Sequence, residues 1–178
     1  ASDMSTAVTM ESIIDDVRNL GEIFDVQDRA KEYADSLENR LSTVTKTVRD
    51  ATGTDIKKVV VMATYQEGNF VVFGANAKLQ NGILQTLNAE NVMEKGGNGL
   101  TLENMVSANP DAIIYITSTR NKDIDVSAKE ALLNESLLSS VPAIADKKII
   151  EVPYDAFMDY GVRNFDTLEE LADFLYNK

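Results

Sequence analysis

The chain contains neither cysteine nor histidine among its 178 residues. Without cysteine it can form no disulfide and no thiolate zinc site. Without histidine it lacks both the usual general base and the commonest metal ligand. That absence weighs against a Ser-His-Asp hydrolase and against zinc or haem held by histidine. We therefore predict no catalytic residues, no metal-ligating residues and no resident cofactor.

Long hydrophobic runs are missing as well. No stretch approaches the roughly 20 apolar residues that a membrane-spanning helix needs. The first residues, Ala1-Ser2-Asp3-Met4, have neither the basic nor the apolar segment of a signal peptide. A secreted protein shows the same features once it has been processed or truncated, so an extracytoplasmic location stays open.

Basic residues are outnumbered, with 17 Lys and Arg against 29 Asp and Glu and a formal net charge of −12. A strongly acidic surface repels phosphate backbones, so we do not expect nucleic-acid binding. The composition, 44% hydrophobic and 26% charged, is otherwise typical of a globular protein. The length allows one domain with a sizeable core.

Residues 1–54 are predicted to be helical. Thr9 is a suitable N-cap for a first helix, and Gly21 is expected to weaken the end of that helix. Its apolar face comprises Ile13, Ile14, Val17, Leu20 and Phe24. From Asp25 or Val26 to Thr52, apolar residues three and four positions apart predict a second helix of about 26 residues. The face of this second helix comprises Val26, Ala30, Tyr33, Leu37, Leu41, Val44 and Val48. A helix so long usually packs along a whole domain or bridges two.

Residues 55–178 are predicted to form an α/β domain, because strands alternate with helices and continuous apolar runs indicate strands buried on both faces. The expected strands are Val59–Ala63, the returning hairpin strand Asn69–Phe73, Ala112–Thr117 and Lys147–Val152. The expected helices are a segment through Ile83, Leu84 and Leu87, then Thr101–Ala108, Ser127–Glu135, Leu137–Ala145 and Asp166–Tyr176. Pro142 is expected to perturb the stretch Leu137–Ala145. This order indicates a mostly parallel sheet.

Two motifs are more simply explained by structure than by function. Gly96-Gly97-Asn98-Gly99 lacks the lysine and hydroxyl of a Walker A loop and does not follow a strand, so a plain loop before a helix is expected. The adjacent carboxylates Asp15-Asp16 and Glu169-Glu170 do not face one another on a helix and are expected to point to solvent.

Candidate ligand-binding residues follow the predicted strands, since ligands of open α/β sheets bind outside the carboxyl ends of the strands. Arg120, with Thr117 to Thr119, is a candidate for anion recognition, and an exposed loop arginine is the alternative. Tyr154, Phe157 and Tyr160 follow the last strand, where aromatic residues line a pocket or cap a core. Tyr65 and Lys78 are weaker candidates, because a residue of either kind at such a position is more often an ordinary surface residue.

Four segments resemble, in order, parts of the iron–siderophore substrate-binding proteins of ABC importers, and the ferric-catecholate branch above all. They are IIDDVRNLGEIFDVQDRAKEYADSLENRL, NFVVFGANAKLQNGILQTLNAENV, TLENMVSANPDAIIYI and SSVPAIADKKIIEVPYDAFMDYG. Together they span nearly the whole chain.

The resemblance implies a Rossmann-like, three-layer carboxy-terminal lobe with a mostly parallel sheet, preceded by a long inter-lobe helix. Residues 1–54 correspond to the helical segment and residues 55–178 to the lobe. The amino-terminal lobe is expected before residue 1, and ligand is expected between the two lobes. Delivery to an ABC permease in the membrane is implied, in the periplasm or from a lipid anchor. Exposed inter-lobe surface would favour self-association of the isolated lobe.

The resemblance also assigns positions to the candidate residues. Lys78 falls where catecholate binders have an arginine, and Arg120 falls close to their arginine after the strand, in a loop about two residues longer here. The tract Pro153–Gly161 matches one whose aromatics touch ligand or ligate iron. Phe157 occupies a tyrosine position there, so iron ligation from it is not expected. The ligand set implied is Tyr65, Lys78, Thr119, Arg120, Tyr154, Phe157 and Tyr160.

Two alternatives remain open. A free-standing flavodoxin-like or other Rossmann-like domain explains the α/β pattern, although it explains neither the long leading helix nor the ordered segments. A cobalamin or haem receptor of the same superfamily is the other, with tyrosine or methionine in place of histidine as haem ligand.

Overall fold

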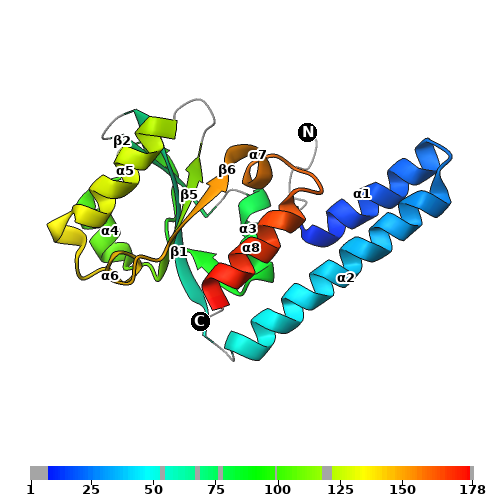
Figure 1. The fold of residues 1–178 in the computed structure, drawn as a ribbon, viewed down its shortest axis with the longest axis horizontal. Helices are drawn as coiled ribbons and strands as arrows, with labels where there is room; N and C mark the ends of the chain where they lie inside the picture. The colour runs from blue at the N-terminus through cyan, green and yellow to red at the C-terminus, as the bar shows by residue number, and fades with distance from the viewer. Residues whose placement is uncertain are drawn as a thin grey trace.

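The computed structural model describes residues 8–52, 55–66, 69–75, 78–98, 100–117 and 122–176. The α-helices are α1 (Met10–Ile23), α2 (Gln27–Thr52), α3 (Lys78–Thr86), α4 (Leu102–Ala108), α5 (Lys122–Asn134), α6 (Pro142–Ala145), α7 (Tyr154–Phe157) and α8 (Asn164–Tyr176), with a 3₁₀ turn η1 (Ser136–Leu138). The strands are β1 (Lys57–Gln66), β2 (Asn69–Phe73), β3 (Ala89–Asn91), β4 (Gly97–Asn98), β5 (Ala112–Thr117) and β6 (Ile149–Pro153). Helices α1 and α2 form an antiparallel hairpin that projects from an α/β lobe (Figure 1).

The hairpin begins with the predicted cap. The Thr9 hydroxyl accepts a hydrogen bond from the Ser12 amide at 3.2 Å, and the Ser12 hydroxyl accepts one from the Thr9 amide at 3.1 Å. This capping box satisfies two backbone donors that the first turn of a helix leaves without partners. The predicted 26-residue length of α2 is confirmed.

The two helices of the hairpin touch closely at Gly21 and Ala30, both of which are buried. A Cβ added at Gly21 would lie less than 3.0 Å from the Ala30 Cβ. Gly21 therefore allows contact between the helices, a role beyond the weakening that helix propensity predicts. Four residues of the predicted apolar face of α2 are buried: Ala30, Leu37, Val44 and Val48. Tyr33 and Val26 are exposed instead, and Ala34, which was not predicted, is buried.

A polar contact joins the middle of α2 to α8. The Arg40 guanidinium donates to Glu169 at 2.7 and 2.8 Å and to Asp166 at 2.6 Å, and it lies 5.7 Å above the centre of the Phe165 ring. A bidentate arginine–carboxylate pair is more directional than an ordinary surface ion pair. Glu169 does face solvent as predicted, but it also holds the hairpin to the lobe.

The sheet is mixed, with strand order β4-β2-β1-β5-β6 and β3 paired to β1. Strands β3, β5 and β6 run parallel with β1 or with one another, whereas β2 returns antiparallel to β1 and β4 antiparallel to β2. Helices cover both faces (Figure 1). One core holds Val59, Val61, Ile114 and Ile116 of the sheet against α1, α2, α3 and α8; the other holds Val60, Met62, Ile113 and Tyr115 against α4, α5, η1 and α6. The predicted three-layer α/β architecture is confirmed.

Several predicted elements need correction. Strand β3 was not predicted, and the glycine-rich segment contributes β4, where Gly96 lies so close to β2 that an added Cβ would meet the Val72 oxygen at 2.9 Å. Gly99 lies outside the described residues. Helix α5 begins at Lys122, five residues earlier than predicted. The helical stretch predicted over Leu137–Ala145 is divided at Pro142 into η1 and α6, because proline favours the first helical turn.

Candidate ligand-binding edge

The carboxyl ends of β1, β5 and β6 meet at one edge of the sheet. Parallel pairing places Met62, Tyr115 and Glu151 side by side on the three strands. β5 and β6 therefore end on the paired residues Thr117 and Pro153, β1 continues to Gln66, and α7 starts directly after β6 (Figure 1). We call this the carboxyl edge, and it is where an open α/β sheet binds ligands.

Tyr65 lies one residue before the end of β1, at an irregularity in the hairpin. Thr64 pairs with Phe70 and Gln66 pairs with Asn69, so Tyr65 is an extra residue on the β1 side. Such a bulge bends a strand and redirects a side chain, and bulges are frequent beside functional sites. The Tyr65 side chain lies outside the described part of the structure.

The side chains of three further predicted ligand-binding residues also lie outside the described part of the structure. Lys78 is the first residue of α3, but its side chain is not described. Thr119 and Arg120 lie in 118–121, which the described residues do not include. The structure therefore leaves these three as predictions. The loops that carry them are anchored on described elements, since β5 ends at Thr117 and α5 begins at Lys122.

The aromatic tract after β6 divides into two kinds of residue. Tyr154, the first residue of α7, is 51% exposed and stands directly at the carboxyl edge. Phe157, in contrast, is fully buried in the core beside α8. A side chain with no accessible surface does not reach a ligand, so its prediction as a ligand contact needs correction. The other interpretation, that an aromatic residue here caps the core, describes Phe157.

Tyr160 links the carboxyl edge to the helical hairpin. Its hydroxyl donates to Asp16 Oδ2 of α1 at 2.6 Å and lies 3.5 Å from the Ser12 hydroxyl. Burial and the neighbouring Asp16 carboxylate raise the pKa of Tyr160. Almost half of the side chain stays exposed. Helix α1 therefore borders the carboxyl edge, which the sequence pattern alone did not show.

A buried polar network lies beneath the same edge. The Tyr115 hydroxyl donates to Asp125 Oδ1 of α5 at 3.1 Å and is also hydrogen-bonded to the Thr64 hydroxyl of β1. Tyr115 has no exposed surface, and Asp125 is only 5% exposed. Four residues further along α5, Lys129 forms an ion pair with Glu151 of β6. Two successive turns of α5 are thus fixed to the sheet.

Alkaline pH is expected to destabilise the fold through buried tyrosines. Burial and the charge of Asp125 raise the pKa of Tyr115 to about 12. The folded state holds this proton more tightly than the unfolded chain, whose tyrosine pKa is about 10, so the stabilisation is complete below pH 10 and disappears between pH 10 and 12. The loss for Tyr115 is about 2–3 kcal/mol.

Denaturant unfolding followed by far-UV circular dichroism at pH 9 to 12 measures this loss. Lysine side chains also lose their protons in this pH range, so the Tyr115→Phe variant serves as the control. Its free energy of unfolding should fall less between pH 9 and 12 than that of the parent chain. Equal losses in the two proteins would contradict the assignment. Tyr176, whose pKa burial likewise raises to about 12, supplies a second contribution that both proteins share.

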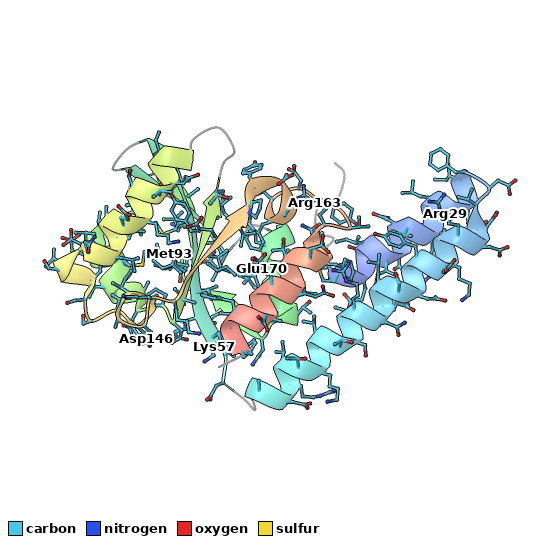
Figure 2. The ribbon with its side chains drawn as sticks, viewed as in Figure 1. Arg29, Lys57, Met93, Asp146, Arg163 and Glu170 are labelled. Atoms are coloured by element: carbon cyan, nitrogen blue, oxygen red, sulfur yellow. The ribbon has the colours of Figure 1, made fainter. Side chains whose placement is uncertain are left out.

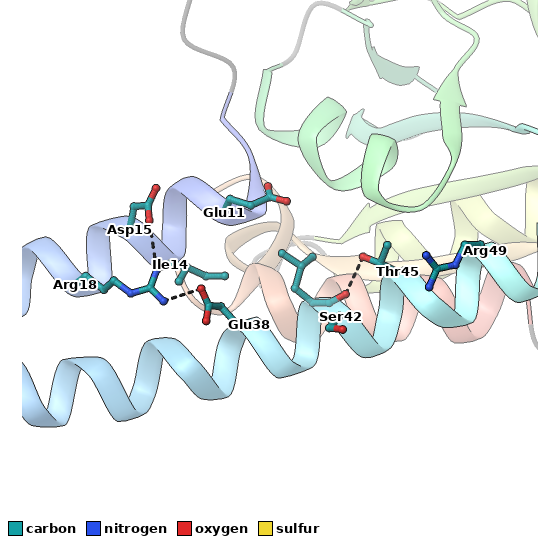
Figure 3. A pocket seen from close by; sticks show the side chains of 9 residues that line it. Glu11, Ile14, Asp15, Arg18, Glu38, Ser42, Thr45 and Arg49 are labelled. Carbon is teal, nitrogen blue, oxygen red and sulfur yellow. Dashed lines mark hydrogen bonds and ion pairs between the residues drawn. The ribbon is translucent and has the colours of Figure 1, made fainter.

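Two grooves lie on the hairpin rather than at the carboxyl edge. The first, of about 330 Å³, is lined by charged and hydroxyl-bearing side chains together with Ile14 and Leu41; Arg18 there pairs with Glu38 at 2.6 Å and with Asp15 at 3.4 Å (Figure 3). Arg18 is therefore already paired with carboxylates and offers an anion little. The second groove, of about 730 Å³, is apolar. Its lining includes Val17, Leu20, Phe24, Val26, Tyr33 and Val162.

The apolar groove runs along the hairpin and is closed on the lobe side by Val162, which precedes α8. Figure 2 shows Arg29, another of its lining residues, at the end of the hairpin farthest from the sheet. Five large apolar side chains are 45% to 72% exposed in this region. They are Leu20, Ile23, Phe24, Val26 and Tyr33. We call this set the distal apolar surface; an exposed patch of this kind commonly marks an interface.

The described residues show neither a metal cluster nor a membrane span. No group of three or more Asp or Glu side chains within that part of the chain is arranged to hold a metal ion. None of the helices described there is long and apolar enough to cross a bilayer.

The chain is similar to solved structures of binding proteins. A periplasmic binding protein from Veillonella parvula superposes with a TM-score of 0.77 at 24% identity, covering 96% of this chain and 58% of that protein. A periplasmic heme-binding protein from Roseiflexus gives 0.75 at 17% identity, covering 95% and 64%. A structure from Saccharomonospora viridis, described as an ABC-type Fe³⁺-hydroxamate transport system, gives 0.73 at 21%, covering 96% and 57%.

These likenesses, all below 25% identity, establish the fold, and the chain spans about three fifths of each of these proteins. No curated protein matches the chain in sequence. Residues 2–156, however, match the family model described as periplasmic binding protein, over the hairpin and most of the α/β lobe. The predicted membership of a binding-protein family, rather than of an enzyme family, is thereby confirmed. The chain belongs to the periplasmic binding protein family.

Proposed function

We propose that the chain is the carboxy-terminal lobe and connecting helix of a two-lobed receptor that binds a ferric siderophore and delivers it to an ABC permease. The observation that carries this proposal is the position of α1 beside the carboxyl edge, fixed by the Tyr160–Asp16 hydrogen bond. A second lobe seated on the hairpin would face this edge and enclose a ligand between the two lobes.

The distal apolar surface supports a second lobe. Residues such as Phe24 and Ile23 are about 70% exposed, although they continue the apolar face of α1. The similar structures are longer than this chain, which covers 57% to 64% of three of them. A lobe preceding α1 would bury these side chains, whereas the isolated chain is expected to self-associate through them.

The proposed ligand is anionic and of the catecholate type. A ferric tris-catecholate carries several negative charges, so Lys78 and Arg120 would supply attraction and orientation in a partly desolvated cleft, with Thr119 as a further polar contact. Tyr65, Tyr154 and Tyr160 would pack against the aromatic rings. Phe157 would support Tyr154 from the core. Binding and release require no covalent step, and the receptor is placed outside the cytoplasm, periplasmic or held by a lipid anchor.

The free-standing Rossmann-like alternative is less well supported, because the family match covers the α1–α2 hairpin as well as the sheet. A haem or corrinoid ligand is the second candidate, favoured by the likeness to a periplasmic heme-binding protein. The chain itself has no histidine for haem, and its tyrosines would be the axial ligands available at the carboxyl edge.

Calorimetric titration with ferric-catecholate, ferric-hydroxamate, haem and cobalamin tests the proposal. The titrations compare this chain with a version that carries an amino-terminal lobe before α1. We expect the two-lobed version alone to bind tightly, with the catecholate complex preferred. In sedimentation, the isolated chain is expected to behave as a species larger than a monomer. If the two-lobed version binds none of these ligands, the receptor proposal fails. A Soret band with haem and no siderophore binding would favour the second candidate.

Replacing Arg120 with alanine is expected to weaken ferric-catecholate binding by the two-lobed protein at least several-fold, because the complex loses one cation and its hydrogen bonds. Arg49→Ala is the matched control, since it removes the same charge from the last turn of α2, near the opposite end of the sheet. Equal affinities for the parent and Arg120→Ala would remove Arg120 from the site.

A further inference from the structure

We infer that the buried hydrogen-bond network Thr64–Tyr115–Asp125 is a positioning element that holds the ends of β1, β5 and α5 in the arrangement a ligand requires. The inference rests on the proposed function, and it assigns a role to three residues that do not contact ligand themselves. The network joins β1 to the consecutive elements β5 and α5, 51 residues further along the chain, and the three converge at the carboxyl edge.

The direction of the hydrogen bonds explains why Tyr115 is the central member. Its hydroxyl donates to Asp125, and its oxygen remains able to accept from Thr64. One side chain thus satisfies polar groups on β1 and α5 at the same time. Thr64 directly precedes the bulged residue Tyr65, so this contact fixes the strand at the point where it bends.

The burial of the network makes its geometry exacting. Tyr115 is completely buried and Asp125 nearly so, and a polar group in such surroundings is costly to leave without a partner. The lobe therefore has few alternative arrangements in which β1, β5 and α5 shift relative to one another. The Lys129–Glu151 ion pair adds a second connection between α5 and the sheet. A site supported in this way keeps its shape before ligand arrives, which lowers the cost of binding.

A purely structural tyrosine would stabilise the lobe without any local effect on the carboxyl edge. The chain offers a matched control for this distinction. Tyr176 on α8 donates a hydrogen bond from its hydroxyl to the Leu87 carbonyl, beside the amino end of β1. Tyr176→Phe therefore makes the same chemical change as Tyr115→Phe at the opposite end of the strand.

The test compares Tyr115→Phe, Thr64→Val and Tyr176→Phe in two measurements. Amide hydrogen exchange on this chain should accelerate at least about tenfold over 64–66 and 122–126 in the first two variants, with α2 and α8 unchanged. In the two-lobed protein, affinity for the ferric-catecholate complex should fall about 5- to 20-fold in Tyr115→Phe, mainly through faster dissociation. Tyr176→Phe should change neither quantity at the carboxyl edge.

Two outcomes would overturn the positioning role: exchange that rises equally throughout the lobe, or a Tyr115→Phe affinity equal to that of Tyr176→Phe. Thr64→Val keeps the test decisive if Tyr115→Phe folds poorly, because it removes one hydroxyl and preserves side-chain shape. Failure of the receptor proposal itself is recognised separately, since the parent two-lobed protein would then bind no ligand while the exchange measurement still applies.

Discussion

Phe157→Ala is expected to lower the free energy of unfolding by about 3–5 kcal/mol, the usual cost of removing a buried phenylalanine ring. Phe157 has no exposed surface and lies in the core with Val152, Phe165 and Leu168. The substitution would leave a cavity between β6 and α8 that the surrounding side chains fill only in part. Denaturant unfolding followed by far-UV circular dichroism measures the change.

Tyr154→Ala is the control, because Tyr154 belongs to the same short helix but is 51% exposed. Its effect on stability should stay within about 0.5 kcal/mol, as for most surface substitutions. Ligand affinity should show the opposite ranking of the two positions. Tyr154→Ala should weaken binding more than Phe157→Leu, a conservative change that keeps the core filled. A Phe157→Ala protein as stable as the parent would show that the ring is not part of the core.

Gly21→Ala is expected to destabilise the chain by about 2–3 kcal/mol, although alanine favours helices more than glycine does. The new methyl group would overlap the Ala30 Cβ on the facing helix, and neither backbone can move without displacing the hairpin. Overpacking should therefore exceed the gain in helix propensity, which is about 1 kcal/mol. Denaturant unfolding measures this effect as well.

The double variant Gly21→Ala/Ala30→Gly isolates the contact. With Ala30 replaced by glycine, the nearest remaining atom to the new methyl group is the Gln27 Cα at 3.6 Å, an ordinary contact distance. Adding Gly21→Ala to the Ala30→Gly protein should then stabilise it by up to about 1 kcal/mol. The same substitution thus changes sign with its neighbour. A Gly21→Ala effect of equal size in both backgrounds would show that the contact is not responsible.

Local patterns in the sequence predicted much of the fold. The apolar runs at Val59–Ala63 and Ala112–Thr117 mark strands covered on both faces, and the Thr9 cap and the length of α2 follow from helix periodicity. Strands β3 and β4 were missed because two or three residues carry no periodic signal, and their pairing partners lie elsewhere in the chain. Gly21 was understood only in part, since its role depends on Ala30 across the hairpin.

The candidate site was predictable as an edge but not residue by residue. The rule that ligands bind at strand carboxyl ends leads to Tyr154 and Tyr160 without a structure. It does not separate Tyr154 from the buried Phe157 three residues later. The Tyr160–Asp16 contact joins residues 144 positions apart, and no local pattern encodes such a pairing. Asp125 resembles any helical carboxylate until Tyr115 is seen beside it.

The contact of α2 with α8 lies far from the outer end of the hairpin, so a small change of angle at this contact would give a large displacement there. Arg40 lies near the middle of the 26-residue helix, about 20 Å from its far end at 1.5 Å per residue. A tilt of about 5° at the contact of Arg40 with Glu169 would carry the far end of the hairpin by nearly 2 Å. That displacement is enough to break the hydrogen bonds of anything aligned there. High ionic strength weakens exposed ion pairs such as Arg40–Glu169. It would thus change how closely the angle of the hairpin is fixed, and with it the position of a partner bound on the hairpin relative to the carboxyl edge.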